Sequence, residues 1–185
     1  MIDLNKLAAE LHDAAVEKGF WAVDDAEEKH VAKMHSELSE AVQEDRCGRP
    51  MLYVDDIEVM DKITDPAQFD GRKPEGVAAE LADFVMMVLD WAKARDEMIA
   101  SPSEVFVSGN ADDITDALLP HLVNNLHEGI ALVHNDWVPC PAVQFAFMTH
   151  FVDLWLRARG VDLWQVVSLK MEYNKSRPKL HGRLY

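Results

Sequence analysis

This chain has little cysteine and no long apolar run. Only Cys47 and Cys140 occur among its 185 residues, and neither belongs to a spacing typical of a zinc site or a disulfide framework. No apolar segment approaches the roughly 18 residues that cross a membrane, and the first residues lack the pattern of a secretion signal. These absences argue against a secreted, disulfide-linked scaffold. We expect a protein of the cytoplasm that has no membrane partner.

Basic residues are also few. The chain has 18 Lys and Arg against 33 Asp and Glu, which gives a formal net charge of −15 at pH 7. Nucleic-acid polymers and membrane surfaces are themselves anionic, so this balance argues against both as partners. The one basic region is the run 170–185, where five Lys and Arg stand against a single Glu.

Strand-like alternation is scarce, whereas apolar residues recur at helical spacing along most of the chain. The length suits one domain, 1–185, with a hydrophobic core of its own. Gly19, Gly48 and Gly160 mark helix ends, and Pro74 marks a helix start. Residues 49–74 form a long connection, in which 54–63 could be a short helix or strand. We therefore predict an all-α fold with helices at about 4–18, 25–45, 75–98, 113–134, 142–159 and 162–175.

Two pairs of acidic residues lie on the second and third predicted helices. Glu37 and Glu40 are three residues apart, as are Glu80 and Asp83, so each pair shares one helical face. Each pair borders the apolar stripe of its helix and does not lie opposite to it. Four converging carboxylates repel one another unless a cation lies between them, and oxygen ligands suit Mg²⁺ or Mn²⁺. The pattern indicates a metal site; the alternative is a set of charges at the edge of a helix interface.

The basic C-terminal run contains a second candidate site. Lys170, Asn174 and Arg177 fall at i, i+4 and i+7, so they share one face of the last predicted helix. An ammonium, an amide and a guanidinium together suit a polyphosphate. The alternative is that the cations only complement the dipole at the helix C-terminus. An acidic metal site elsewhere favours the phosphate interpretation, because metal-dependent phosphoryl chemistry needs both.

Several segments resemble one known family in sequence and in order. They are Glu17-Lys-Gly-Phe-Trp, Lys33-Met-His-Ser-Glu-Leu-Ser-Glu-Ala, Glu80-Leu-Ala-Asp-Phe-Val, Gly160-Val-Asp-Leu-Trp and Lys170-Met-Glu-Tyr-Asn-Lys-Ser-Arg-Pro-Lys-Leu-His-Gly. Over about 5–48, 75–95 and 157–183 the chain resembles the MazG-like all-α nucleoside triphosphate pyrophosphohydrolases. The segment 97–142 departs from the compact members of that family, and we expect it to be an inserted helical segment.

The resemblance implies a helical bundle of the all-α NTP pyrophosphatase type. It implies hydrolysis of a (deoxy)nucleoside triphosphate to the monophosphate and pyrophosphate, with Mg²⁺ as cofactor and assembly into a homodimer or homotetramer. We further hypothesise that Glu40 orients or deprotonates the attacking water. Trp21 could stack on the base, although a tryptophan between helices is more often a core anchor. The residues carried over as metal ligands and catalytic groups are Glu37, Glu40, Glu80 and Asp83, and those carried over as substrate-binding are Lys170, Asn174 and Arg177.

Other interpretations stay open from the sequence alone. Asp90 and Glu44 each follow an acidic pair on the same helical face, and each could be an outer acid of the site or part of a local salt-bridge network. His35 could reach a substrate or be a partly buried, hydrogen-bonded residue. A di-iron carboxylate bundle needs an E-x-x-H motif on each of two helices, and only Glu27 and His30 have that form. The last alternative is a non-catalytic helical module for nucleotide binding or protein interaction.

Overall fold

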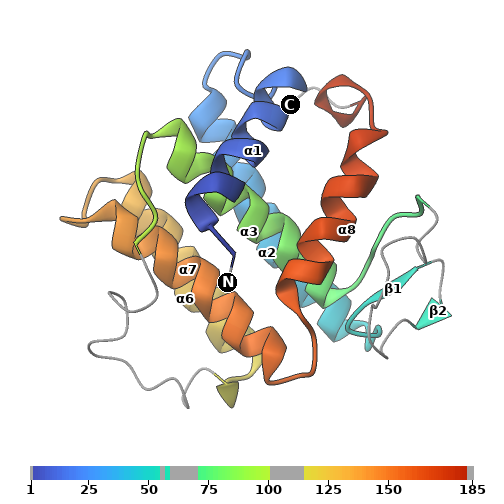
Figure 1. Ribbon diagram of the computed structural model, residues 1–185. Coiled ribbons are helices and arrows are strands. Elements are labelled where there is room, and N and C mark those ends of the chain that lie inside the picture. Colours follow the sequence, from blue (N-terminus) through green and yellow to red (C-terminus); the bar gives the residue numbers. More distant parts are fainter. Residues whose placement is uncertain (1, 55–56, 59–70, 101–114, 183–185) are drawn as a thin grey trace.

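The fold is all-α, as the sequence predicts. The computed structural model describes residues 2–54, 57–58, 71–100 and 115–182. Within them lie six α-helices, a short antiparallel hairpin and a terminal 3₁₀ turn (Figure 1). Their bounds are α1 Leu4–Glu17, α2 Ala26–Arg46, β1 Tyr53–Val54, β2 Ile57–Glu58, α3 Val77–Ala94, α6 Leu119–His134, α7 Pro141–Arg157, α8 Leu163–Lys175 and η2 Lys179–Gly182.

Helix α3 is the centre of the fold. It packs against α1, α2, α7 and α8, and most of its side chains are buried. Phe84, Val88 and Trp91 are fully enclosed in a single core cluster shared with the neighbouring helices. A helix that is apolar around most of its circumference belongs in the interior. An acidic residue on α3 is therefore held close to the core.

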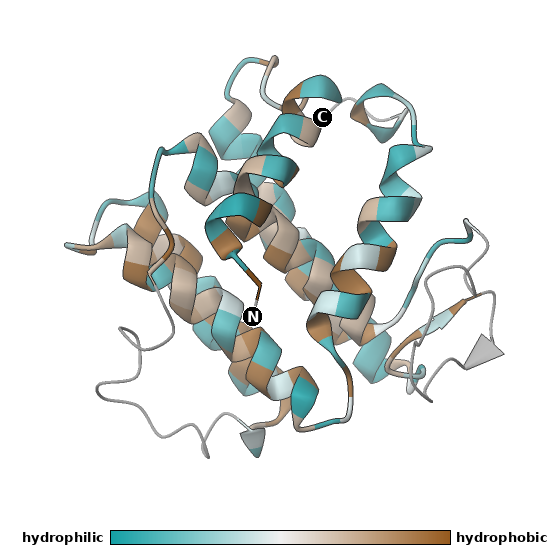
Figure 2. Cartoon of the chain, in the orientation of Figure 1, coloured by the Kyte–Doolittle hydropathy of each residue, from teal (hydrophilic) through white to brown (hydrophobic). Residues whose placement is uncertain are grey.

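Helices α6 and α7 form a pair that covers α2 and α3. Helix α6 packs on α2 and α7, and α7 packs on α3. Figure 2 shows mixed hydrophobic and hydrophilic positions along both helices, as expected of helices buried on one side. At Gly129 of α6, a Cβ atom would lie 2.8 Å from the Gln144 side chain and 3.0 Å from Met148, so glycine permits close packing on α7. The described residues of the segment 97–142 thus include the whole of α6 and the start of α7.

Two predicted helix starts differ from the structure. The third helix begins at Val77 and not at 75. Gly76 has a φ of 100° and lies close to the backbone of Pro50 and Met51. A Cβ there would lie 2.7 Å from the carbonyl oxygen of Pro50 and 2.8 Å from that of Met51. The fourth helix begins at Leu119 with Pro120 in its first turn, and residues 113–114 lie outside the described ranges.

The long connection 49–74 contains more structure than the sequence predicted. The strands β1 and β2 pair in antiparallel fashion, and Tyr53 also exchanges two backbone hydrogen bonds of 3.0 Å with Glu75. The possible helix or strand at 54–63 is thus a strand in its described part, and 59–70 lie outside the described ranges.

The C-terminal segment returns to the first helix. Asp162 caps α8 by accepting from the backbone N–H groups of Trp164 and Gln165, as the sequence predicted. After α8, the backbone N–H of Leu180 donates to the Lys18 carbonyl at 2.9 Å. This contact places η2 beside the turn that follows α1. No helix in the described ranges is both long and apolar enough to cross a membrane.

Candidate metal centre

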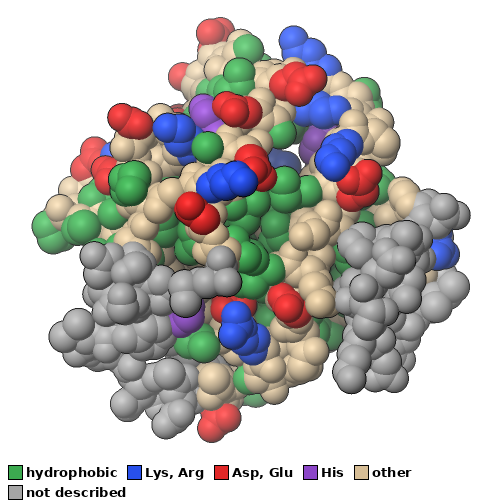
Figure 3. All heavy atoms as spheres, in the orientation of Figure 1, with side chains coloured by type: hydrophobic (Ala, Val, Ile, Leu, Met, Phe, Trp, Pro, Cys, Tyr) green, Lys and Arg blue, Asp and Glu red, His purple; other side chains and the backbone are tan. Residues whose placement is uncertain are grey.

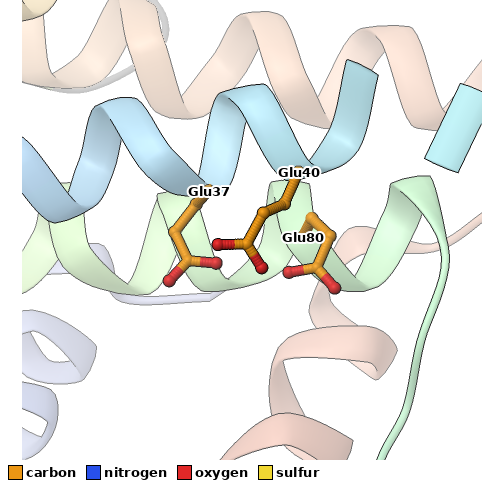
Figure 4. A group of neighbouring side chains, drawn as sticks. All are labelled: Glu37, Glu40 and Glu80. Carbon is orange, nitrogen blue, oxygen red and sulfur yellow. The ribbon is translucent and has the colours of Figure 1, made fainter. Parts of the chain in front are cut away.

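Three of the four predicted metal ligands converge on one point. Glu37 and Glu40 come from α2 and Glu80 from α3, and their carboxylates project to the same side of the helix pair (Figure 4). One oxygen from each residue lies within 4.8 Å of the other two. Glu37 is 4% exposed and Glu80 5% exposed, whereas Glu40 is open to solvent. We refer to these residues as the carboxylate trio.

The start of α3 is fixed by the connection that precedes it. The backbone N–H of Ala78 donates to the Met51 carbonyl at 2.9 Å, just beyond the close approach at Gly76. The Tyr53 hydroxyl donates to Glu44 of α2 at 3.0 Å, so the same segment is tied to both helices. Burial and the bond to Glu44 raise the pKa of Tyr53 to about 12. These contacts hold the first turn of α3, with Glu80, against the second half of α2.

The electrostatics of the trio are unfavourable without a cation. Burial, together with the neighbouring charges of Asp83 and Glu40, raises the pKa of Glu80 to about 7 against the opposing effect of Lys170. Part of the negative charge is neutralised within α2, because Lys33 forms an ion pair with Glu37. The Ser36 hydroxyl donates to Glu40 at 2.9 Å. Carboxyl oxygens arranged in this way suit a hard divalent cation.

Asp83, the fourth predicted ligand, lies outside the trio. Its carboxylate forms an ion pair with the ammonium of Lys170 at 2.6 Å, and Lys170 also donates to the Pro74 carbonyl at 3.3 Å. Lys170 is only 2% exposed. Burial alone would lower its pKa, but the carboxylates of Asp83 and Glu80 outweigh burial and raise it. Helix α8 therefore supplies a buried positive charge to the acidic face of α3.

A cavity of about 430 Å³ opens beside the trio, between α1, α2, α3 and α8. Figure 3 shows the face of the molecule that contains α1 and α8. Hydrophobic side chains lie in the middle of this face, between the two helices, and charged side chains surround them. Asp83 and Lys33, which contact Lys170 and Glu37 respectively, both line the cavity. The cavity and the trio are thus neighbouring parts of one region.

The predicted phosphate-binding residues are divided between the cavity and the acids. Asn174 and Arg177 line the cavity, and the Arg177 guanidinium donates to the Asn174 side-chain oxygen at 3.3 Å. Lys170 does not line it, since its ammonium is turned toward Asp83. Asn174 of α8 and Arg177, which follows the helix end, therefore both line the cavity, whereas Lys170 neutralises acidic groups of α3.

Asp90 is the centre of a local network at the cavity wall. It is 5% exposed and accepts hydrogen bonds from His12 Nδ1 at 2.7 Å and from Trp21 Nε1 at 3.0 and 3.1 Å. Trp21 also lies against the ring of His30, with ring centroids 4.9 Å apart. Burial raises the pKa of Asp90, although His30 and these hydrogen bonds oppose that effect. Trp21 is thus held by Asp90 and His30, and His12 belongs to the same network although no sequence pattern indicates it.

The remaining candidate residues have local partners. Glu27 accepts from Trp91 Nε1 at 2.8 Å and from Arg95 at 2.9 Å, whereas His30 Nε2 lies 2.8 Å from the Met87 carbonyl. Among the described residues, the carboxylate trio is the one group of His, Cys, Asp and Glu close enough to hold a metal, and it contains no histidine. This composition gives no support to a di-iron site.

The hydrogen-bonding role expected for His35 is also found. Its Nδ1 lies 2.7 Å from Nδ1 of His127 on α6, and the two rings are stacked. Burial lowers the pKa of both histidines, so the neutral forms are favoured. His35 therefore links α2 to the α6 and α7 pair and is not among the residues that line the cavity.

Comparisons with protein-family models, with curated proteins and with solved structures each find no match to this chain.

Proposed function

We propose that this protein is a metal-dependent nucleoside triphosphate pyrophosphohydrolase, which releases a nucleoside monophosphate and pyrophosphate. The observation that carries the proposal is the convergence of Glu37, Glu40 and Glu80 from two helices beside a cavity with basic residues. Acids that hold a cation and bases that face an anion are the two requirements of metal-assisted phosphoryl chemistry. The ordered motifs that resemble the MazG-like family support the same assignment.

In this proposal the carboxylates of the trio would hold Mg²⁺, and the bound ion would lower the pKa of a water molecule and neutralise phosphate charge. Glu37 and Glu80 are buried and fixed by neighbouring helices, which suits permanent ligands. Glu40 is open to solvent, which suits the role of orienting the attacking water and accepting its proton. The ion pair with Lys170 holds the Asp83 carboxylate on the acidic face of α3.

The substrate is proposed to lie with its phosphates near the trio and its nucleoside in the cavity. Arg177 offers a planar guanidinium to phosphate oxygens, and Asn174 offers an amide that can donate to a phosphate or sugar oxygen. The cavity volume of about 430 Å³ falls in the range of small-molecule sites. Apolar side chains on its walls suit the faces of a base.

The test is release of pyrophosphate from a panel of NTPs and dNTPs, with Mg²⁺ and with EDTA, followed by identification of both products. We expect a monophosphate and pyrophosphate in Mg²⁺ only, and loss of release in Glu40→Gln. Glu28→Gln is the matched control, because Glu28 is an exposed acid on the same helix, paired with His134. A folded protein that is silent across the panel would contradict the proposal and favour a non-catalytic binding module. Release of a diphosphate and phosphate would also contradict it.

A further inference from the structure

The inner wall of the cavity presents hydrogen-bond acceptors among apolar side chains. Asp90 and His30 line the cavity, and both are buried. Met86, Met87 and Met171 line it as well. Methionine sulfur and methylene groups make favourable contacts with aromatic rings. The faces of a flat aromatic ligand would thus contact apolar side chains. The edge of the ligand would contact polar atoms, and these atoms would determine which ligands bind.

Whether each of these polar atoms donates or accepts a hydrogen bond follows from its partners. A carbonyl can only accept, so His30 Nε2 carries the hydrogen that it donates to Met87. Burial lowers the pKa of His30, which favours the neutral ring, and its Nδ1 is then an acceptor. Asp90 accepts N–H donors from His12 and Trp21, and these bonds stabilise its ionised, acceptor-only form against the burial that raises its pKa.

With His30 neutral and Asp90 ionised, two hydrogen-bond acceptors lie close together. His30 Nδ1 and Asp90 Oδ2 are 3.8 Å apart. Oδ1 of Asp90 accepts from both His12 and Trp21, whereas among the described residues Oδ2 accepts one hydrogen bond, from Trp21 at 3.1 Å. Since a carboxylate oxygen has two lone pairs, Oδ2 retains capacity for another donor. A group with two N–H bonds on one atom would satisfy both acceptors.

We propose that Asp90 and His30 bind the exocyclic amino group of a nucleobase, so that the preferred substrates carry an amino-bearing base and not uracil or thymine. The inference rests on the proposed function, which identifies the ligand as a nucleotide. An amino group donates two hydrogens, as the two acceptors require. The O4 oxygen of uracil would instead place its lone pairs against those of Asp90 and His30. A carboxylate that accepts from a base amine is an established form of base recognition.

The test is equilibrium binding measured by calorimetry in EDTA, so that it does not depend on turnover. The probes are dCMP and dUMP, which differ at position 4 by an amine and an oxygen, and then dAMP and dIMP, which differ in the same way at position 6. One hydrogen bond to a charged group corresponds to roughly 10- to 100-fold in affinity, and we expect the amino-bearing member to bind at least about tenfold tighter in one pair or both. Equal affinities in both pairs, tighter binding of the oxo members, or no binding of any probe would overturn the assignment.

The variant Asp90→Asn tests the residue itself. It removes the charge and offers N–H donors, so we expect the preference to fall to within about threefold or to reverse. Asp153→Asn is the matched control, because Asp153 is a buried acid paired with Arg157 on α7 and does not line the cavity. An unchanged preference in folded Asp90→Asn would overturn the role of Asp90. The wild-type comparison stands by itself if this variant does not fold.

The failure of this inference is distinguishable from failure of the proposed function. Pyrophosphate release with equal binding of the paired probes would overturn the base assignment alone. A clear preference for the amino-bearing probes, without release from any triphosphate, would overturn the hydrolase assignment and leave a nucleotide-binding protein.

Discussion

Glu80→Gln should reduce pyrophosphate release by more than about 100-fold, because changes even to groups that only support metal ligands cost about 10- to 100-fold. The same substitution should make the metal-free protein more stable at pH 8. Glu80 is buried among acidic neighbours, and glutamine keeps its shape without the charge. Activity and stability therefore change in opposite directions, which is typical of a residue kept for function. The measurements are initial rates at saturating Mg²⁺ and urea unfolding in EDTA.

The pH dependence of this effect follows from the pKa of Glu80. The pKa is about 7 in the folded protein and 4.5 in the reference state, so the folded state binds the proton more tightly. The stabilising contribution is complete below about pH 4.5 and is lost as the pH rises through 7. Over this pH range the free energy of unfolding of the wild type should fall by on the order of 3 kcal/mol through Glu80. Glu80→Gln should match the wild type near pH 4.5 and exceed it at pH 8.

Glu28→Gln provides the control for both measurements, since it removes an acid from an exposed position of α2. It should change the rate less than about twofold and the unfolding free energy by less than about 0.5 kcal/mol. If Glu80→Gln retained the wild-type rate, or lost stability equally at pH 4.5 and pH 8, the metal-ligand role of Glu80 would be wrong.

Lys170→Met should lower the free energy of unfolding by about 3–5 kcal/mol at pH 8, the range expected when one member of a buried ion pair is removed. Methionine preserves most of the volume, so the loss reports on charge: Asp83 and Glu80 would remain near the core without their cation. The loss should shrink at pH 5, where Glu80 is protonated. Millimolar Mg²⁺ should restore part of the stability at pH 8, because a bound cation replaces the missing charge.

Lys6→Met is the control for this prediction. Lys6 forms an exposed ion pair with Glu10 at 3.8 Å, and such pairs contribute about 0–1 kcal/mol. A loss in Lys170→Met that is equal at both pH values and insensitive to Mg²⁺ would show that Lys170 acts through packing. The charge-compensating role assigned here would then be wrong.

The helices were predictable because local patterns determine most of them. Apolar spacing gave the six helices, Gly19 and Gly160 follow helix ends, and Asp162 is the predicted cap. The exact start of α3 was not predictable. It depends on the close approach of Gly76 to the carbonyls of Pro50 and Met51, which are distant in sequence. The hairpin of β1 and β2 was also only partly anticipated, since short strands leave little periodicity.

The convergence of the acidic side chains was predictable where it involves two helices, and it was not predictable where a third helix contributes a residue. The i, i+3 spacing and the border position placed Glu37, Glu40 and Glu80 together. The same reasoning placed Asp83 with them, but the packing of α8 on α3 brings Lys170 to Asp83. A lysine near a helix C-terminus is ordinarily exposed, so its burial has no local signal. The Asp90 network likewise joins α1, the following turn, α2 and α3, and only the structure shows it.

The most direct test of the central claim, that the carboxylate trio holds a divalent cation, is equilibrium Mn²⁺ binding followed by the electron paramagnetic resonance signal of the free ion. The wild type and Glu28→Gln should bind Mn²⁺ equally and release it to excess Mg²⁺. Glu37→Gln and Glu80→Gln should bind at least about tenfold more weakly, since each lacks one buried carboxylate ligand. Absence of binding by the folded wild type, or equal binding by all four proteins, would contradict the claim.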